Sequence, residues 1–285
     1  METTPISRSS DDPVYIDLHI HSYYSDGLLS PQQIIQYAKE RHLRAISITD
    51  HDTLAGTAEA VRLGAQQEVE VVPGIEISVI YHESEIHLLG YYIDQSSAAI
   101  AEYIATLADS RNRRAHQILD VLRKEGIRIP YELVARKANG APIGRPHIAQ
   151  VMVDEGYVFS AYEAFQKYLG EKRAGDIPKF SLDVQQAIDI IQQAGGLAFW
   201  AHPATAPNEE VLYKLLDCGI DGIETFHPKH SPEQQAHYRE LARYYKLLES
   251  GGSDCHGGRE GGIALGTLKV PYEFLDRIKR RLCLQ

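Results

Sequence analysis

The chain has 285 residues, of which 44% are hydrophobic, and a formal net charge of −10 at pH 7. This length fits one barrel-sized domain or a domain with an insertion, and the charge argues against a general nucleic-acid coat protein while allowing a local basic pocket. Its three widely separated cysteines imply no disulfide framework and favour a reducing cytoplasm. The polar start, Met1 to Asp12, lacks the apolar core of a signal peptide, and no apolar run approaches the roughly 20 residues of a membrane span.

The first predicted element is a buried strand at residues 15–21, Tyr-Ile-Asp-Leu-His-Ile-His. Side chains alternate along a strand, so the isoleucines and the leucine point one way while Asp17, His19 and His21 share the other face. Two imidazoles one pleat repeat apart can hold a single metal ion, and neutral imidazole is a common metal ligand. Ordinary polar packing explains such a pair equally well when it is taken alone.

Strand and helix patterns then alternate up to about residue 95. Ser30-Pro31 predicts a helix start, with serine as the cap and proline at the first helical position. A second helix is expected at about 57–67, and strands are expected at 45–49, 70–73, 76–80 and 85–93. This order indicates a parallel sheet with helices outside it.

The rhythm stops between about residues 96 and 175, where the pattern is mostly helical. One long helix is expected at 101–124, and shorter ones at 131–137, 146–155 and 161–169. Strands at 197–201 and 222–226, each ending in a His-Pro pair, then resume the alternation with helices at 182–194, 209–218 and 232–245. We therefore predict an inserted helical subdomain at 96–175, which interrupts an α/β barrel formed by 13–95 and 176–285.

Chemistry in a parallel α/β barrel collects at the carboxyl ends of the strands. Histidine and acidic residues gather at those ends, namely His19, His21, Asp26, Asp50, His51, Glu76, His87, His202, Glu224, His227, Asp254 and His256. Any one of them could be an ordinary polar residue of the barrel rim. Their common placement indicates one shared site.

Six motifs resemble those of the polymerase and histidinol phosphatase (PHP) family of metal-dependent phosphoesterases. They are H-x-H-S-x-x-S-D-G, I-T-D-H-D, G-I-E-I-S, H-L-L-G-Y, A-H-P and G-S-D-x-H, in this order from Ile16 to about Leu268. The resemblance implies a distorted seven-stranded α/β barrel that commonly holds three metal ions. It also implies an enzyme that hydrolyses phosphate esters.

The resemblance further implies which residues hold the metals. The first metal would take His19, His21, Glu76 and Asp254; the second Glu76, as a bridge, with His87 and His202; the third Asp26, His51 and His256. Asp26 stands where some members have histidine, which makes the third site richer in oxygen. That favours manganese or iron over zinc, with magnesium also open.

Metal ions a few Å apart clamp phosphate oxygens and lower the pKa of a shared water. Asp50, beside His51, is interpreted as a residue that orients an imidazole, with a strand-end cap as the alternative. His202 and His227 complete the candidates for catalytic roles.

The segment Gly144-Arg145-Pro146-His147 opens a predicted helix, where free amides and a guanidinium suit a phosphate. The alternative is a helix start with a surface arginine. Within the family the segment resembles a subgroup that removes the 3′-phosphate from 3′,5′-bisphosphonucleosides or trims short RNA from the 5′ end. Arg145 would then hold the 5′-phosphate. Further pocket candidates are His147, Lys179, Glu224, His227, Lys229 and His230, whereas Arg111, Arg113 and Arg114 are interpreted as solvated helix residues.

Two other functions remain open at this point. One is a phosphatase of a small metabolite such as histidinol phosphate, and the other is a non-enzymatic metal-binding module. The leading hypothesis expects a small nucleotide or short RNA as the only partner. It implies no membrane and no stable protein partner, which is compatible with a monomer.

Overall fold

The computed structural model describes residues 13–82, 84–138, 143–170, 173–178, 180–205, 209–258 and 262–284. The fold is mixed α/β, with a four-stranded sheet of order β3-β2-β1-β9 and a five-stranded sheet of order β4-β5-β6-β7-β8. In chain order the strands are β1 (Tyr15–Ile20), β2 (Leu43–Ile48), β3 (Glu70–Val71), β4 (Gly74–Tyr81), β5 (Ser84–Tyr91), β6 (Leu197–Trp200), β7 (Gly222–Phe226), β8 (Leu248–Gly251) and β9 (Val270–Pro271).

The expectation of a parallel sheet is correct for only part of the molecule. β1 pairs in parallel with β2, β2 with β3, β6 with β7 and β7 with β8. β4–β5, β5–β6 and β1–β9 are antiparallel. The chain between Tyr81 and Ser84 is too short for the crossover that parallel neighbours need, so β4 and β5 form a hairpin.

The sequence predicts that Gly74 separates the two strands within residues 70–80, but the separation falls at residues 72–73. Proline cannot donate to a ladder, and the chain leaves β3 before Pro73. Gly74 then begins β4 instead of breaking it. A Cβ at Gly74 would stand 2.3 Å from Ser47 Oγ, so glycine lets the two sheets come close at this point.

Single parallel bridges join the two sheets at the ends of β1 and β2. Ile20 bridges to Cys255, just after β8, and His51 bridges to Glu76 in β4. These bridges bring the carboxyl ends of strands from both sheets to one edge. The closed seven-stranded barrel stays a prediction.

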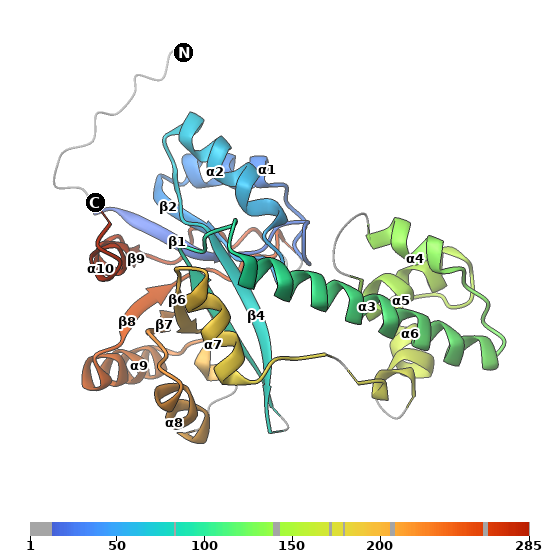
Figure 1. Ribbon diagram of the computed structural model, residues 1–285. Coiled ribbons are helices and arrows are strands. Elements are labelled where there is room, and N and C mark those ends of the chain that lie inside the picture. Colours follow the sequence, from blue (N-terminus) through green and yellow to red (C-terminus); the bar gives the residue numbers. More distant parts are fainter. Residues whose placement is uncertain are drawn as a thin grey trace, which may run out of the picture.

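Helices cover the sheets (Figure 1). They are α1 (Pro31–Glu40), α2 (Ala55–Gln67), α7 (Val184–Gln193), α8 (Glu209–Asp217), α9 (Pro232–Tyr245) and α10 (Glu273–Arg281), with a 3₁₀ turn at Pro203–Thr205. The predicted start of α1 is confirmed, because the Ser30 side chain accepts from the Gln33 amide and Pro31 occupies the first turn. Among the described residues, none of the helices combines the length and the apolar character that a membrane span requires.

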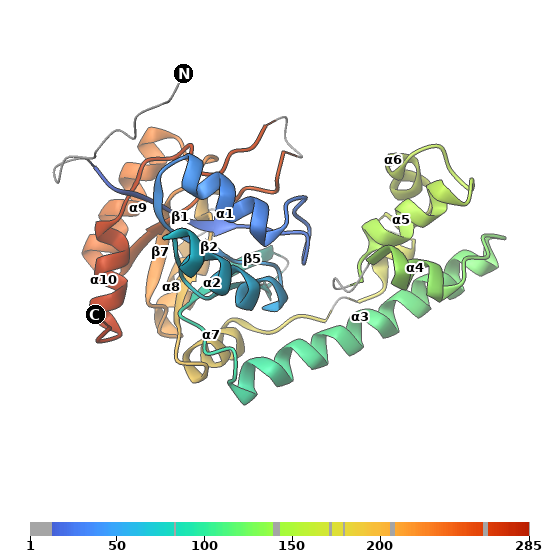
Figure 2. The same ribbon diagram turned by 90° about the horizontal axis from the view of Figure 1, so that it is seen from above.

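The inserted helices lie along a long helix that leaves the sheets (Figures 1 and 2). They are α3 (Ala98–Lys124), α4 (Tyr131–Ala138), α5 (Arg145–Asp154) and α6 (Ala161–Ala164), followed by a π-helical turn (Phe165–Leu169) and a 3₁₀ turn (Ala174–Asp176). The first half of α3 packs into the core of the sheets through Ile100, Tyr103 and Leu107. Its second half packs into a separate core through Ile118 and Leu122. The subdomain boundaries at 96 and 175 stay a prediction.

Candidate metal centre and adjoining cavities

Glu76 of β4 stands at the centre of the site and is only 1% exposed. A ring nitrogen of each of five histidines lies 2.8–3.3 Å from one of its two carboxylate oxygens, namely His19, His21, His51, His87 and His202. These histidines come from β1, β5 and the chain after β1, β2 and β6. Imidazoles therefore surround both oxygens of this buried carboxylate.

The chain after β8 closes the site against β1. Asp254 Oδ1 lies 3.5 Å from His19 Nε2 and 3.2 Å from His21 Nε2. A Cβ at Gly252 would stand 2.3 Å from the backbone nitrogen of His19, so only glycine lets the chain pass this close. Residues from opposite ends of the sequence therefore meet.

Four groups of side chains offer ligand atoms within 4.8 Å of one another among the described residues. They are His21-Asp26-His51-His256, His19-His21-Glu76, His19-His227-Asp254 and His51-Glu76-His87. The groups contain eight of the nine residues of the sequence hypothesis, and the ninth, His202, lies 3.1 Å from Glu76 Oε1. The grouping differs from the expected one. His51 joins Glu76 and His87 where His202 was expected, and His227, expected in catalysis, joins Asp254.

Buried ring nitrogens test whether these residues fit a cation. Nδ1 of His21 makes no hydrogen bond, and His21 Nε2 and His51 Nδ1 face carboxylate oxygens at 3.1–3.3 Å without the alignment of a hydrogen bond. A buried polar atom without a partner is costly, whereas a metal ion satisfies an imidazole lone pair. The mixture of nitrogen and oxygen donors therefore fits divalent transition metals.

The charges of the cluster are strongly coupled. Burial alone would lower the pKa of His21, but Asp254 and Glu76 outweigh it and raise that pKa to about 10. For His51, burial dominates and lowers the pKa to about 4. The imidazoles keep the pKa of the Glu76 carboxyl well below its usual range despite complete burial. Glu76 is therefore a carboxylate, as a metal ligand must be.

Glu224 of β7 lies behind the histidines, fully buried. Its carboxylate faces His19 Nδ1 at 3.0 Å and accepts the backbone N–H of His202 at 2.7 Å. In this structure Glu224 is a partner of His19 and of the His202 backbone, and its place in the substrate pocket stays a prediction. A carboxylate at Nδ1 sets the tautomer of His19 and points Nε2 toward Glu76.

The backbone is strained where two of these residues sit. His202 has φ 29° and Asp254 has φ 50°, values that non-glycine residues rarely adopt. Such conformations persist only where the surroundings impose them. At both positions the backbone conformation is held by the contacts that also place the side chains next to Glu76 and His19.

Asp50 does not orient an imidazole through a hydrogen bond that the structure describes. Its carboxylate accepts from the Ser22 amide at 2.7 Å and from the hydroxyls of Ser22 and Ser25 at 2.6 Å. Asp50 therefore fixes the loop that carries Asp26. Asp17 plays a similar part on the other side, accepting from the amides of Ser253 at 2.9 Å and Gly266 at 2.8 Å.

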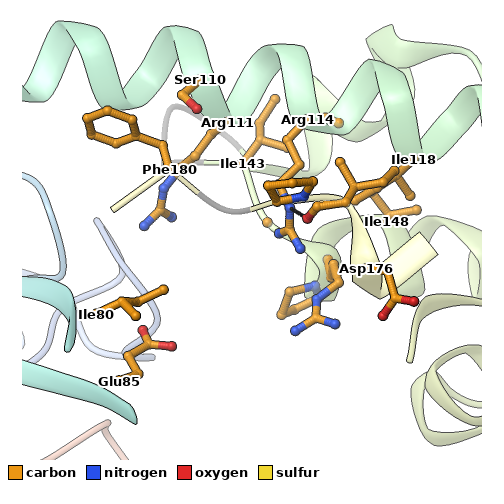
Figure 3. Close-up of a pocket in the computed structure, with 16 residues that line it drawn as sticks. Ile80, Glu85, Ser110, Arg111, Arg114, Ile118, Ile143, Ile148, Asp176 and Phe180 are labelled. Carbon is orange, nitrogen blue, oxygen red and sulfur yellow. Dashed lines mark hydrogen bonds between the residues drawn. The ribbon is translucent and has the colours of Figure 1, made fainter. Parts of the chain in front are cut away.

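One cavity borders the cluster, and a second shares a boundary with the first. The smaller, about 210 Å³, is bordered by Asp26, His51 and His87 on one side and by Gly144, Pro146 and His147 on the other. The larger, about 510 Å³, lies between α3, α5 and the β4–β5 hairpin (Figure 3). Both are lined by Glu85, Arg111, Gly144 and Pro146, so they share a boundary.

Three arginines border the larger cavity. Figure 3 shows Arg111 and Arg114 extending from α3 into it, with Ile80 and Glu85 on the opposite wall. Arg145 also borders it, where its Nη1 donates to Leu169 O at 3.0 Å and its guanidinium lies over the Phe165 ring. Burial, followed by Arg145 and Arg111, lowers the pKa of Arg114. The carboxylates of Glu85 and Asp176 also line the cavity, so its three arginines leave a modest excess of positive charge beside isoleucine and phenylalanine side chains, which suits an anion with an apolar part.

The hypothesis that Arg111 is solvated is wrong. Its side chain is 21% exposed and pairs with the buried Asp52 at 2.5 Å. Asp52, Tyr103 and Glu85 also belong to this region, although the sequence alone does not predict it. The available signal for Asp52 was its position directly after His51 in the I-T-D-H-D motif.

The other substrate candidates are dispersed. His147 borders the smaller cavity, and its Nδ1 accepts the Gly144 amide at 3.1 Å. His230 donates from Nδ1 to Thr225 O at 3.0 Å. Lys229 Nζ lies 3.8 Å from Asp254 Oδ2. Lys179 lies outside the described residues.

An α/β fold with clustered imidazoles and carboxylates at strand ends defines a class of metal-binding proteins. The PHP domain matches residues 17–202 of this chain. The chain therefore belongs to the PHP domain family.

Characterised relatives share this family across most of the chain. The 5′-3′ exoribonuclease Rnm of Escherichia coli (strain K12) is 34% identical over 252 residues, which covers 85% of each chain. A 3′,5′-nucleoside bisphosphate phosphatase of Chromobacterium violaceum is 33% identical over 257 residues, covering 88% of this chain and 90% of the relative. A phosphoribosyl 1,2-cyclic phosphate 1,2-diphosphodiesterase of Eggerthella lenta is 32% identical over 260 residues, covering 90% and 98%.

The fold agrees with a solved structure. A protein of Bifidobacterium adolescentis, described as a proposed metal-dependent phosphoesterase, superposes with a TM-score of 0.79 at 28% identity and covers 95% of this chain and 98% of its own.

Proposed function

We propose that this chain is a metal-dependent phosphoesterase of nucleotides, and that it removes the 3′-phosphate from 3′,5′-bisphosphonucleosides, trims short 5′-phosphorylated RNA, or does both. The observation that carries this proposal is the shared boundary of the two cavities. One is bordered by Asp26, His51 and His87, and the other by arginines. A substrate with two phosphates matches this arrangement, with the reacting phosphate at the smaller cavity and the other phosphate at the larger one.

The relatives support a nucleotide substrate. The E. coli relative is named for exoribonuclease activity and the C. violaceum relative for action on 3′,5′-nucleoside bisphosphates. Both substrates carry a phosphate away from the bond that is cleaved.

The metal ions of the proposal are divalent and three per chain, with Mn²⁺ first and Fe²⁺, Zn²⁺ or Mg²⁺ as alternatives. Bound there, they would neutralise phosphate charge and lower the pKa of a bound water. The holding residues would be the nine of the sequence hypothesis, with Glu76 central. The chain orients them itself, since Glu224 fixes His19 and Thr205 lies 2.9 Å from His202 Nδ1.

His227 has a defined tautomer in this arrangement. Its Nδ1 accepts the Lys229 amide at 3.1 Å, so its proton resides on Nε2, 3.3 Å from Asp254 Oδ2. His227 therefore holds a proton beside Asp254 at the edge of the cluster. We assign it this proton-holding role in catalysis.

Binding of a remote phosphate is assigned to the larger cavity, with Arg145 and Arg114 as the residues that contact it. A phosphate held away from the reacting ester uses its binding energy to position that ester. The isoleucine and phenylalanine side chains of the cavity offer apolar surface to a nucleoside.

The proposal includes the architecture that the sequence implied. We treat β1, β2, β4, β5, β6, β7 and β8 as a distorted seven-stranded barrel formed by 13–95 and 176–285. The bridges Ile20–Cys255 and His51–Glu76 support closure at both seams. The helices of 96–175 form the substrate-binding insertion.

A panel of phosphate esters assayed with Mn²⁺ tests the function. We expect kcat/KM on adenosine 3′,5′-bisphosphate or a 5′-phosphorylated trinucleotide to exceed that on the same compound without its 5′-phosphate by about tenfold or more. The panel includes phosphoribosyl 1,2-cyclic phosphate, because the E. lenta relative is named for it. It also includes histidinol phosphate. A clear preference for either of these two would replace the proposed substrate class.

A further inference from the structure

We infer that Asp52 is a positioning residue, which holds the arginine-lined cavity of the insertion in register with the metal centre by binding Arg111 and Tyr103 of α3. This inference deepens the proposed function and rests on it for the identity of the substrate.

Asp52 is a buried carboxylate whose side-chain partners come largely from α3. It is 2% exposed. Its Oδ1 accepts the Tyr103 hydroxyl at 2.6 Å, and its Oδ2 accepts Arg111 Nη2 at 2.5 Å. The Ser78 amide adds a longer contact of 3.4 Å. These α3 residues lie 51 and 59 positions away in the sequence, so the contacts are tertiary and not part of a local turn.

The backbone of Asp52 belongs to the metal centre. Asp52 directly follows His51, and its own N–H donates to the Glu76 carbonyl at 2.9 Å. Its φ of 56° is a left-handed value that a non-glycine residue keeps only when its surroundings impose it. One residue thus links the backbone of two candidate ligands to the side chains of the inserted helix.

Arg111 occupies the shared boundary of the two cavities. Figure 3 shows it extending from α3 toward the space in front of Ile80 and Glu85. A guanidinium has five N–H donors in a rigid plane, so holding one nitrogen restricts the directions in which the rest can point. Asp52 therefore orients the guanidinium before any ligand arrives, which reduces the ordering cost of binding.

The competing explanation is an ion pair that only stabilises the fold. Such a pair would, when broken, loosen the protein as a whole and would not discriminate between substrates. The positioning role predicts a local change at the root of α3 and a loss that depends on the substrate's second phosphate.

Hydrogen–deuterium exchange on the metal-free protein gives a readout that does not depend on activity. We expect Asp52→Asn to accelerate exchange in residues 98–111 and 50–54, and Tyr103→Phe to do so to a smaller extent. Exchange in 115–122 and 148–152, which belong to the separate core of the insertion, should stay unchanged. Arg113→Ala removes an exposed arginine of the same helix and is the matched control. Unchanged exchange in both variants, or a uniform increase across the chain, would overturn the inference.

Kinetics on the Mn²⁺-loaded protein give the second readout. Asp52→Asn and Tyr103→Phe should raise KM for adenosine 3′,5′-bisphosphate more than they lower kcat. For Asp52→Asn the loss of kcat/KM should be about tenfold larger than the loss on p-nitrophenyl phosphate, because misplacement of a positioning group costs on this scale. Equal losses on the two esters would contradict the inference.

The two readouts separate the failures. A wild type inactive on the bisphosphate would remove the proposed function, while the exchange experiment would still decide whether Asp52 holds α3. If Asp52→Asn does not fold, Tyr103→Phe carries the test, since it deletes one hydroxyl and keeps the ion pair.

Discussion

The metal centre and the arginine-lined cavity lie side by side but are built by different means. The side chains of the centre stand at or near strand ends, where backbone pairing fixes their directions, as with His51 and Glu76 across a bridge. The cavity takes its arginines from α3 and α5, whose orientation depends on contacts such as Asp52–Arg111. The first is set by sheet register and the second by helix docking.

This difference predicts which mutations should reduce hydrolysis itself and which should reduce substrate selectivity. A centre with redundant backbone support should lose activity only when a ligand or its partner is removed. A cavity formed by docked helices should instead lose selectivity through changes remote from the reacting phosphate. Four predictions test this contrast.

Removal of metal should have the largest effect. A chelator should abolish hydrolysis of every ester, and Mn²⁺ should restore it. The reason is that the proposed metal ions supply the Lewis acid, whereas imidazoles and carboxylates are Lewis bases. The loaded protein should contain about three ions per chain, as the proposed ligand set implies, measured by elemental analysis. It should also melt at a higher temperature, since a ligand at about 100 times its Kd adds about 2.7 kcal/mol of stability. One ion or none in an active preparation would contradict the trinuclear proposal.

Glu76→Ala should reduce turnover by at least about 100-fold on all esters, because it removes the central carboxylate of the cluster. Metal content should fall with it. Glu132→Ala, which removes an exposed glutamate of α4, serves as the control. A Glu76→Ala protein with a native circular dichroism spectrum and near-normal turnover would exclude this site.

The same contrast explains what could be predicted from the sequence. The residues around Glu76 were predicted individually because strand periodicity places alternate side chains on one face and parallel strand ends on one edge. The Ser30 cap was predictable for a similar reason, since its signal is local. The hairpin of β4 and β5 was missed because apolar runs do not reveal the direction in which strands pair.

The errors in the site arose from long-range contacts. The apolar run that Glu224 ends predicts a place at the site but not its partner His19, which lies 205 positions away. A helix with several arginines predicts that Arg111 is solvated, because such helices usually expose their arginines. The buried Asp52 that pairs with it follows β2, on another element. No local pattern encodes such pairs.

Glu224→Gln should have an intermediate effect. The amide cannot supply the charge that faces His19 Nδ1, so metal affinity or activity should drop about 10–100-fold on all esters alike. Titration with Mn²⁺ measures the affinity, and excess Mn²⁺ should recover part of the activity. A loss restricted to nucleotides would instead place Glu224 in the substrate pocket.

Arg145→Ala should have the smallest and most selective effect. Its guanidinium is held by Leu169 O and the Phe165 ring at the wall of the larger cavity, which leaves further donors for an anion. A hydrogen bond to a charged group contributes about 1.5–3 kcal/mol, or roughly tenfold to a hundredfold in kcat/KM. We expect the lower end on adenosine 3′,5′-bisphosphate, because Arg114 borders the same cavity. A 3′-monophosphate has no 5′-phosphate to hold and should be nearly unaffected.

Arg136→Ala, which removes an exposed arginine of α4, controls for lost charge in the insertion. Measurement of kcat/KM for both substrates with all three proteins decides the matter. Equal losses would make Arg145 a structural residue of the helix start, and the cavity would then owe its anion preference to the α3 arginines alone.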